Sequence, residues 1–329
     1  MKKLVNHIDN ILTESLDGFV AAHGDIVALG AEHEFVRRKS VRPGKVALIS
    51  GGGAGHEPLH AGFVGHGMLD AACPGQIFTS PTPNQMLNAA QAVDGGAGVL
   101  FIVKNYSGDM MNFEMAAEML DQANETVIVN DDVAVENSTY TTGRRGVAGT
   151  LVVEKILGAA AERGDNLQQL KALGDAVNKA TASMGVALTS CTVPAAGSPT
   201  FQISAEEMEV GVGIHGEPGR RRVPLASADA IAMELTTAVL KDLNLQAGQE
   251  VILLVNGFGG TPMLELYLMV NAARKVLSVS GIHVVRYLTG SYVTSLEMAG
   301  CSITVTAADA QMLALWDAPV HTAALRWGM

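Results

Sequence analysis

Short apolar runs of strand length alternate along the whole chain with longer stretches in which apolar residues recur at helical spacing. Such runs predict buried strands, and the longer periodic stretches predict amphipathic helices. The predicted strands are Val46–Ser50, Gly98–Val103, Thr126–Asn130, Val251–Val255, Ile282–Leu288 and Ser302–Val305. The predicted helices are Val5–His23, Gln85–Val93, Met110–Ala123, Val147–Arg163, Ser227–Leu240 and Met263–Leu277. This alternation is typical of an α/β fold, and no apolar run is long enough for a transmembrane helix.

The first predicted strand leads into a glycine-rich segment, SGGGAGHEP, at residues 50–58. Its four glycines lack a Cβ atom, so they allow the backbone to turn sharply and to approach a ligand closely. His56 and Glu57 stand at the mouth of this predicted loop, and Pro58 is expected to open a helix. A strand, a glycine turn and a helix start place chemistry at the carboxyl edge of an α/β sheet. The segment therefore predicts a site.

Three known motifs compete for this segment, and each fails. The dinucleotide pattern G-x-G-x-x-G requires a glycine where the chain has His56 or Pro58, and no Lys-Ser/Thr pair follows as in a P-loop. His56 to His60 spells H-E-x-x-H, with His66 at the spacing of a third zinc ligand. However, Phe63 replaces the glycine of the metzincin pattern, and Pro58 disfavours one helix through both histidines. We expect no zinc protease and no metal site.

Composition narrows the class of protein further. The 329 residues are 48% hydrophobic and 17% charged, which is typical of a well-packed globule. The net charge of −11 argues against nucleic acid or an anionic membrane as a partner, and the 5% of aromatic residues is too low for a base-stacking surface. We predict two domains, residues 1–182 and 183–329. Three widely spaced cysteines and a start without an apolar signal region predict a cytoplasmic location.

Polar loops follow several of the predicted strands. One contains His56, a second runs from Lys104 to Asp109, and a third contains His215. Because such strand ends converge on one crevice in open α/β sheets, these loops predict a shared site. A carboxylate beside a histidine suits proton transfer from a substrate hydroxyl. A further histidine there is a base, a metal ligand or a nucleophile towards a carbonyl, and spacing alone does not choose among these roles.

Seven segments covering nearly the whole chain resemble the family of dihydroxyacetone-binding subunits of dihydroxyacetone kinase, called DhaK. The resemblance is carried by SGGGAGHEP (50–58), CPGQIFTSPTP (73–83), IVKNYSGDMMNFEMA (102–116), NDDVAVENSTYTTGRRGVAGT (130–150), CTVPAAG (191–197), EMEVGVGIHGEPG (207–219) and ALWDAPVHTAALRWG (314–328). It implies the DhaK-type fold, with two α/β domains that each contain a mixed or parallel sheet flanked by helices.

The resemblance also implies a mechanism. His215 matches the histidine that captures the ketone of dihydroxyacetone as a covalent hemiaminal. His56 and Asp109 match the residues that orient and deprotonate the terminal hydroxyl, which then receives a phosphoryl group to give dihydroxyacetone phosphate. Gly53 and Lys104 match the remaining substrate contacts.

Partners follow from the same resemblance. This chain is expected to bind no cofactor itself. ADP or ATP and Mg²⁺ are expected on a separate subunit, DhaL, which a phosphotransferase-system protein, DhaM, rephosphorylates from phosphoenolpyruvate. A homodimer is also implied.

Several alternatives stay open at this point. The chain is either the kinase subunit or a sensing paralogue that reports dihydroxyacetone to a transcription regulator, and the substrate is dihydroxyacetone or a related ketose such as erythrulose. Arg220–Arg222 meets an acidic partner or is merely exposed charge, and His321 lines the cleft or braces the C-terminal segment. We expect Arg144 and Arg145 to be solvated at a helix start and Asp131 and Asp132 to have loop or cap roles.

Overall fold

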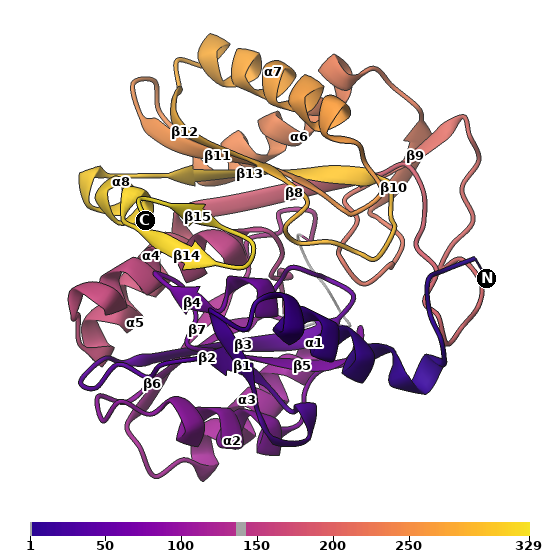
Figure 1. Cartoon of the computed structure of the whole chain (residues 1–329). Coiled ribbons are helices and arrows are strands. Elements are labelled where there is room, and N and C mark those ends of the chain that lie inside the picture. The colour runs from indigo at the N-terminus through magenta and orange to yellow at the C-terminus, as the bar shows by residue number, and fades with distance from the viewer. Residues whose placement is uncertain (1, 136–142) are drawn as a thin grey trace. The chain divides into compact units, whose positions relative to one another are not determined.

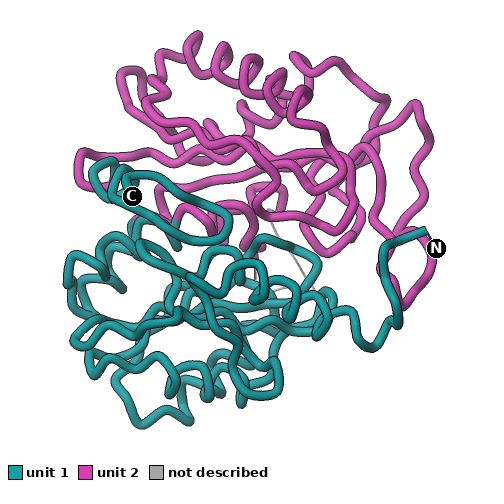
Figure 2. The backbone as a smooth tube through the Cα atoms, viewed as in Figure 1, with its two compact units in different colours: residues 1–129, 153–176, 313–329 teal, residues 130–152, 177–312 magenta. Residues whose placement is uncertain are grey.

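The computed structural model describes residues 2–135 and 143–329, which form two compact units (Figure 2). Unit 1 comprises residues 1–129, 153–176 and 313–329, and unit 2 comprises residues 130–152 and 177–312. Each unit therefore combines separate stretches of the chain. The predicted domains, residues 1–182 and 183–329, are single consecutive stretches, and this division stays a prediction. Residues 136–142 of the segment from 130 to 150 lie outside the described residues.

Unit 1 is built on a six-stranded sheet with the strand order β1-β2-β5-β3-β6-β7 (Figure 1). Its central strands pair in parallel, and β1 and β2 extend it in antiparallel fashion. The strands are β1 (Val27–Leu29), β2 (Val36–Arg38), β3 (Ala47–Ala54), β5 (Ala71–Ile77), β6 (Val99–Lys104) and β7 (Asn124–Val129). A second, three-stranded sheet joins β4 (Gly65–His66), β14 (Val320–Thr322) and β15 (Arg326–Trp327).

Helices α2 (Pro83–Val93) and α3 (Ser107–Met119) lie side by side along one face of this sheet (Figure 1). Helix α2 begins where Thr82 and Gln85 form a capping box, and Pro83 occupies the first turn, where no N–H is needed. Apolar residues of both helices and of β3, β5 and β6 form one buried cluster, which includes Phe101 and Phe113. Burial of this cluster holds the strand ends in place. The remaining helices with residues in unit 1 are α1 (Ile11–Ala22), α4 (Gly149–Arg163), α5 (Leu167–Lys179) and α8 (Ala310–Asp317), with short 3-10 turns at Ile8–Asn10, Ala31–His33 and Ala61–Phe63.

Unit 2 contains a second six-stranded sheet, in the order β10-β9-β8-β13-β11-β12. Only β11 and β12 pair in parallel, so the sheet is mixed. Helices α6 (Ala228–Leu243) and α7 (Met263–Val279) pack against each other and against the sheet. The strands are β8 (Thr181–Ala187), β9 (Glu207–Val210), β10 (Arg221–Pro224), β11 (Glu250–Gly257), β12 (His283–Gly290) and β13 (Gly300–Ala307). The predicted α/β class, with sheets flanked by helices, is confirmed.

The glycine-rich segment differs from its prediction. Strand β3 does not end at Ser50 but continues through Gly51, Gly52 and Gly53 to Ala54. Cys73–Gly75 also lies in a strand, β5, and pairs with the glycines in parallel. The physical reason is close approach: a Cβ atom on Gly51 would lie 2.6 Å from the carbonyl oxygen of Cys73. The glycines are needed here for strand packing.

The turn itself comes later, at Gly55, whose φ of +99° suits glycine. Pro58 does not open a helix, so that expectation is wrong. The chain instead makes successive turns, in which Leu59 N–H donates to the His56 carbonyl and Gly62 N–H donates to the Pro58 carbonyl. These turns direct His60 into the interior, where it is 5% exposed.

Helix α4 is shared by the two units, since Val152 belongs to unit 2 and Val153 to unit 1. Its start is capped by Asp131, whose carboxylate oxygens accept hydrogen bonds from Val147 N–H at 2.8 Å and Gly149 N–H at 2.7 Å. The predicted cap role of Asp131 is confirmed. No helix among the described residues is long and apolar enough to cross a membrane.

Candidate active site

Lys104 is the last residue of β6 and its side chain is fully buried beside the glycine strand. Its ammonium group lies 3.3 Å from the Gly51 carbonyl oxygen, to which it donates. A Cβ atom on Gly52 would lie only 2.3 Å from Lys104 Nζ. The glycine at position 52 therefore makes room for a buried cation at the end of the strand.

Asp109 lies beside this lysine, in the first turn of α3. Its side chain is 3% exposed, and Asp109 Oδ2 is 3.8 Å from Lys104 Nζ. A carboxylate in a first turn is also favoured by the helix dipole. Within the described residues, buried Asp109 Oδ1 has no hydrogen-bond partner. Buried polar atoms are rarely left without one, so this oxygen is where a bound molecule's hydroxyl is expected.

Two further buried residues extend the cluster. His60 Nε2 lies 2.8 Å from Lys104 Nζ, and His60 Nδ1 lies 2.6 Å from Glu154 Oε1. Glu154 comes from α4 and is 0% exposed. Four elements of unit 1 thus contribute one buried cluster of ionisable groups, which we call the lysine cluster: His60, Lys104, Asp109 and Glu154.

Burial controls the electrostatics of the lysine cluster. It lowers the pKa of Lys104, an effect that the charges of Asp109 and Glu154 oppose. It raises the pKa of Glu154 to about 8, against the opposing charge of Lys104. Burial, and then the charges of Lys104 and His56, hold the pKa of His60 well below its usual value, so His60 is neutral at pH 7.

His56 and Gly53 flank the turn after β3. His56 is fully buried, and its ring stacks on Phe78 with the ring centroids 5.1 Å apart. A Cβ atom on Gly53 would lie 2.5 Å from the backbone nitrogen of Thr79, so this position requires glycine. The carboxylate of Glu57 accepts a hydrogen bond from Gly55 N–H at 3.0 Å and shapes the turn.

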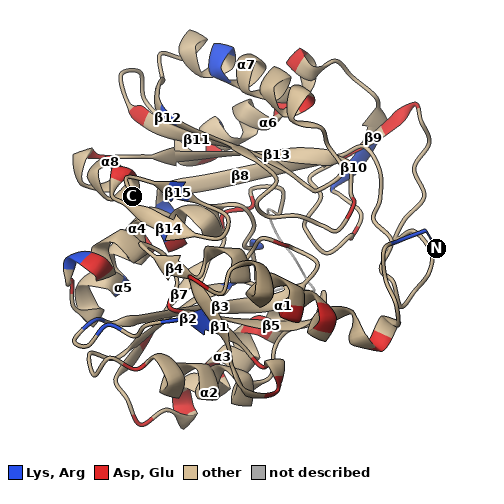
Figure 3. Cartoon of the chain, viewed as in Figure 1, with Lys and Arg blue, Asp and Glu red and all other residues tan. Residues whose placement is uncertain are grey.

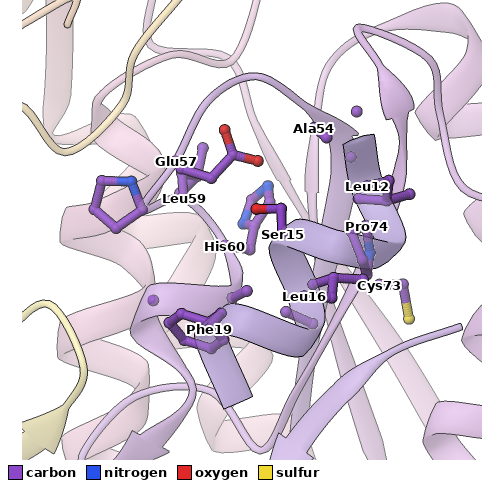
Figure 4. A pocket seen from close by; sticks show the side chains of 16 residues that line it. Leu12, Ser15, Leu16, Phe19, Ala54, Glu57, Leu59, His60, Cys73 and Pro74 are labelled. Carbon is purple, nitrogen blue, oxygen red and sulfur yellow. The ribbon is translucent and has the colours of Figure 1, made fainter. Parts of the chain in front are cut away.

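A cavity of about 350 Å³ lies in unit 1, next to this turn. Figure 4 shows Glu57 and His60 on its walls, together with Ser15 and Phe19 of α1. Gly52 and Gly53 also line it. The cavity is mostly apolar, so the buried groups of the lysine cluster adjoin a space that is poor in polar partners.

His215 belongs to unit 2, in a loop that follows β9. It is half-buried, and its backbone N–H donates to Glu217 Oε2 at 2.9 Å. The next residue, Gly216, has a φ of +72°, and a Cβ atom there would lie 2.7 Å from the Cys191 sulfur. As in the turn at Glu57, a glutamate two residues further along the chain accepts a backbone N–H.

Arg145 holds the His215 loop from within unit 2. Its guanidinium donates to Glu217 Oε1 at 2.9 Å, to the Gly211 carbonyl at 2.9 Å and to Asp132 Oδ2 at 2.8 Å. Arg145 is 8% exposed, so the expectation that it is solvated is wrong. Its partner Asp132 is buried, and the fork of the guanidinium reaches three acceptors that no exposed position would offer. Arg144 pairs with Asp242.

Other candidates from the sequence have structural partners. In the H-E-x-x-H string, His60 contacts Glu154 through one ring nitrogen and Lys104 through the other. Across residues 2–135 and 143–329, no three His, Cys, Asp or Glu side chains are grouped as metal ligands. His321 pairs with His66 in the three-stranded sheet, which supports the bracing role.

Charged residues are dispersed over the elements of both units (Figure 3). In the arginine triplet, Arg221 pairs with Glu234, and Arg222 donates to Glu209 at 2.9 Å. Two of its members therefore have acidic partners within this chain.

Sequence reasoning assigned no function to His60, Glu154 or Arg145. The signal for Glu154 is a charged pair, Glu154-Lys155, inside an otherwise apolar helical run, and both side chains are fully buried. Charged residues are almost never fully buried unless they are paired. The predicted residues His56, Lys104 and Asp109 all lie in unit 1, as does Gly53.

Comparisons with known protein families and with curated proteins identify relatives that match nearly the whole chain. A family model described as the Dak1 domain matches residues 17–324. A curated relative from Listeria innocua, the "PTS-dependent dihydroxyacetone kinase 1, dihydroxyacetone-binding subunit DhaK", is 50% identical over 93% of this chain and 94% of its own length.

Two solved structures share the fold. The "dihydroxyacetone kinase operon co-activator Dha-DhaQ" is 32% identical, with a TM-score of 0.90 over 94% of this chain and 97% of the other. The dihydroxyacetone kinase from C. freundii in complex with AMP-PNP and Mg²⁺ is 33% identical, with a TM-score of 0.89 over 98% of this chain and 60% of that longer chain.

Proposed function

Because this chain belongs to the Dak1 domain family, we propose that it is the dihydroxyacetone-binding subunit of a dihydroxyacetone kinase. Its reaction is phosphoryl transfer to a terminal hydroxyl of dihydroxyacetone, which gives dihydroxyacetone phosphate. The observation that carries the proposal is the buried pair of Lys104 and Asp109, in which one carboxylate oxygen faces the lysine and the other has no partner among the described residues.

Asp109 is the general base in this proposal. As the terminal oxygen of the substrate forms its bond to the γ-phosphorus of ATP, the bond from this phosphorus to the β–γ bridging oxygen breaks and ADP leaves with the electron pair. The O–H bond of the substrate breaks as well, and its proton passes to Asp109 Oδ1. Lys104 and His56 orient the substrate, and Gly53 leaves room for it. The proposal is supported by the arrangement at the end of β6, where a carboxylate and an ammonium group share one buried position.

His215 captures the substrate in this proposal. A ring nitrogen of the neutral imidazole forms a bond to the ketone carbon, the π electrons move to the oxygen, and the ring N–H proton passes to that oxygen to complete the hemiaminal. Glycerol has no carbonyl group, so it is rejected by bond chemistry rather than by contacts to hydroxyls. The hydrogen bonds from Arg145 and from His215 N–H to Glu217 support this role, because they fix the backbone that carries the nucleophile.

The phosphoryl donor comes from a partner in this proposal. A DhaL-type subunit carries the nucleotide with Mg²⁺, and a DhaM-type protein passes phosphoryl groups to it from phosphoenolpyruvate. The Listeria relative is named as dependent on a phosphotransferase system, which supports this arrangement. The complex of the C. freundii kinase with AMP-PNP and Mg²⁺ supports the need for a nucleotide and a metal ion in this reaction. We also propose that the chain forms a homodimer.

A sensing role is the second candidate, and a specific observation favours it: the co-activator DhaQ shares the fold with a TM-score of 0.90. Capture of a ketone for sensing needs a nucleophile and a pocket, but no base for a hydroxyl. Asp109, and the 50% identity to a kinase subunit against 32% to the co-activator, favour the enzyme.

Carbon-13 NMR of C2-labelled dihydroxyacetone tests the capture step. We expect the ketone signal to vanish and a tetrahedral-carbon signal to appear with the wild type and with a His283→Ala control, which removes an exposed histidine of the same unit. The His215→Ala variant should leave the ketone signal intact. Persistence of the ketone signal at saturating wild-type protein would refute capture. Turnover with a DhaL-type partner then separates the two candidates, since a sensor produces no phosphate ester.

A further inference from the structure

The lysine cluster contains two residues that the proposed mechanism does not use. His60 and Glu154 are almost completely buried, and they connect Lys104 to a second carboxylate in addition to Asp109. Burying a carboxylate and an ammonium costs free energy unless they are paired. If residue 154 served only the packing of α4, an apolar side chain would do so at a lower cost in free energy.

The polarity of the hydrogen bonds follows from the chemistry of the groups. An ammonium group only donates, so His60 Nε2 must accept from Lys104. The ring proton of the neutral imidazole is then on Nδ1 and is donated to Glu154 Oε1, and this hydrogen bond is stronger when Glu154 is a carboxylate than when it is a carboxylic acid. The geometry thus ties the charge of Lys104 to the charge of Glu154 through one imidazole ring.

We propose that His60 and Glu154 are positioning residues that keep Lys104 in its ammonium form beside Asp109, and so set the alkaline limit of the pH range in which the site works. This inference rests on the proposed function, because it gives Lys104 a role in turnover.

A neutral arrangement competes with the charged one. If the Nδ1 proton moves to Glu154 while a proton of Lys104 moves to Nε2, the carboxylate becomes a carboxylic acid and the ammonium becomes an amine. Two N–H bonds break while one O–H and one N–H bond form, and no proton is gained from solvent. The raised pKa of Glu154 and the lowered pKa of Lys104 bring these two arrangements close together in free energy. Small changes at Glu154 therefore decide the charge of Lys104.

The groups that face Lys104 come from four elements. Strand β3 provides the Gly51 carbonyl, the following turns provide His60 and, behind it, His56, helix α3 provides Asp109, and helix α4 provides Glu154. Of these, the two carboxylates raise the pKa of Lys104. Loss of the charge at Glu154 must therefore lower it, and the ammonium then deprotonates at a lower pH.

Glu154→Gln is the test, with Glu162→Gln as a matched control. Glu162 is another ion-paired glutamate of α4 and is partly buried, but its partners are Arg38, Arg42 and His66, away from the lysine cluster. The pH midpoint of Lys104 is measured by carbon-13 NMR of lysine labelled at Cε, with the signal assigned by a Lys104→Gln variant. We expect the midpoint to fall by about one pH unit in Glu154→Gln, to stay unchanged in Glu162→Gln and to be restored in Glu154→Asp.

Turnover with a DhaL-type partner is recorded over the same pH range. We expect the alkaline limb of the kcat profile to move down together with the midpoint of Lys104. An unchanged midpoint in Glu154→Gln would overturn the inference, and so would a shifted midpoint with an unshifted limb. Absence of turnover in the wild type would refute the proposed function instead, while the NMR titration would still decide whether Glu154 controls Lys104.

Discussion

Replacement of Asp109 by asparagine tests the centre of the proposed chemistry. The amide has the size and shape of the carboxylate but accepts no proton from a hydroxyl near neutral pH. We expect kcat with a DhaL-type partner to fall by about 10²–10⁴-fold, the usual contribution of a general base. Capture of dihydroxyacetone, read by the tetrahedral-carbon signal, should remain, because His215 and its supporting loop are untouched.

The structure also gives the size of the electrostatic change. At the 3.8 Å between Lys104 Nζ and Asp109 Oδ2, the gross attraction is about 4 kcal/mol for an effective dielectric constant of about 20. Part of this attraction offsets the cost of burying both groups, so the net loss of stability is smaller. A kcat loss of 10²–10⁴-fold corresponds to about 3–5 kcal/mol in the activation barrier. The two effects are similar in size, so a control for folding is essential.

Asp70→Asn provides that control. Asp70 forms a second buried lysine–aspartate pair in unit 1, with Lys45, and it also accepts hydrogen bonds from Arg38 and from Leu48 N–H. We expect its replacement to lower the melting temperature at least as much as Asp109→Asn does. Its kcat per folded molecule should stay close to that of the wild type, because Asp70 lies outside the lysine cluster.

The outcomes separate cleanly. If Asp109→Asn retained more than a tenth of the wild-type kcat, Asp109 would not be the base, and the unpartnered oxygen would have to be explained by structure alone. If Asp70→Asn lost as much kcat per folded molecule as Asp109→Asn, the loss would reflect damage to the fold of unit 1. Circular dichroism melts and kcat measured on the same protein samples make both comparisons direct.

Three further predictions concern the supporting residues. Arg145→Lys cannot reach all three acceptors with one nitrogen, so we expect the dissociation constant for dihydroxyacetone to rise about tenfold, with Arg144→Lys unchanged as the control in the same titration. Gly53→Ala should destabilise the fold by about 1–3 kcal/mol in urea melts, because its Cβ would lie 2.5 Å from a backbone nitrogen. Gly18→Ala, with open space around it in α1, should be stabilising by about 0.5–1 kcal/mol, and the opposite order would contradict this argument. Burial raises the pKa of Asp132 from its ordinary value of 3.8 to about 6, so between pH 3.8 and pH 6 the folded state keeps a proton that the unfolded state has lost. The free energy of unfolding should fall by about 3 kcal/mol as the pH rises through this window, and a urea series showing the same fall in Asp132→Asn would refute the assignment.

Sequence patterns predicted the class of the fold and most of its strands and helices, because apolar runs and helical spacing report burial directly. They placed the glycines of the first strand in a loop, because glycine has a low propensity for β-strands. Positions 51 and 53 of the strand require glycine because the neighbouring backbone leaves no room for a Cβ atom. That backbone belongs to residues 20 or more positions away in the chain. Only the three-dimensional arrangement contains this information.

The same limit applies to the site. His56, Lys104 and Asp109 were identified from motifs that carry a strong resemblance. Glu154 was missed because its importance comes from one contact with His60, almost a hundred positions earlier in the chain. Arg145 was assigned to solvent because arginine usually is exposed. Its burial depends on three acceptors that fold together around it, including the carboxylate of Asp132.

Helix α4 makes the chain sensitive to changes of length at one place. Each residue of an α-helix rotates the next by about 100°, so inserting one residue between Gly149 and Glu154 would turn everything after it by more than a quarter of a circle. The Asp131 cap would keep its bonds at the start of the helix, but Glu154 would point away from His60. Natural variation in length among related proteins should therefore accumulate in other segments and spare these few residues.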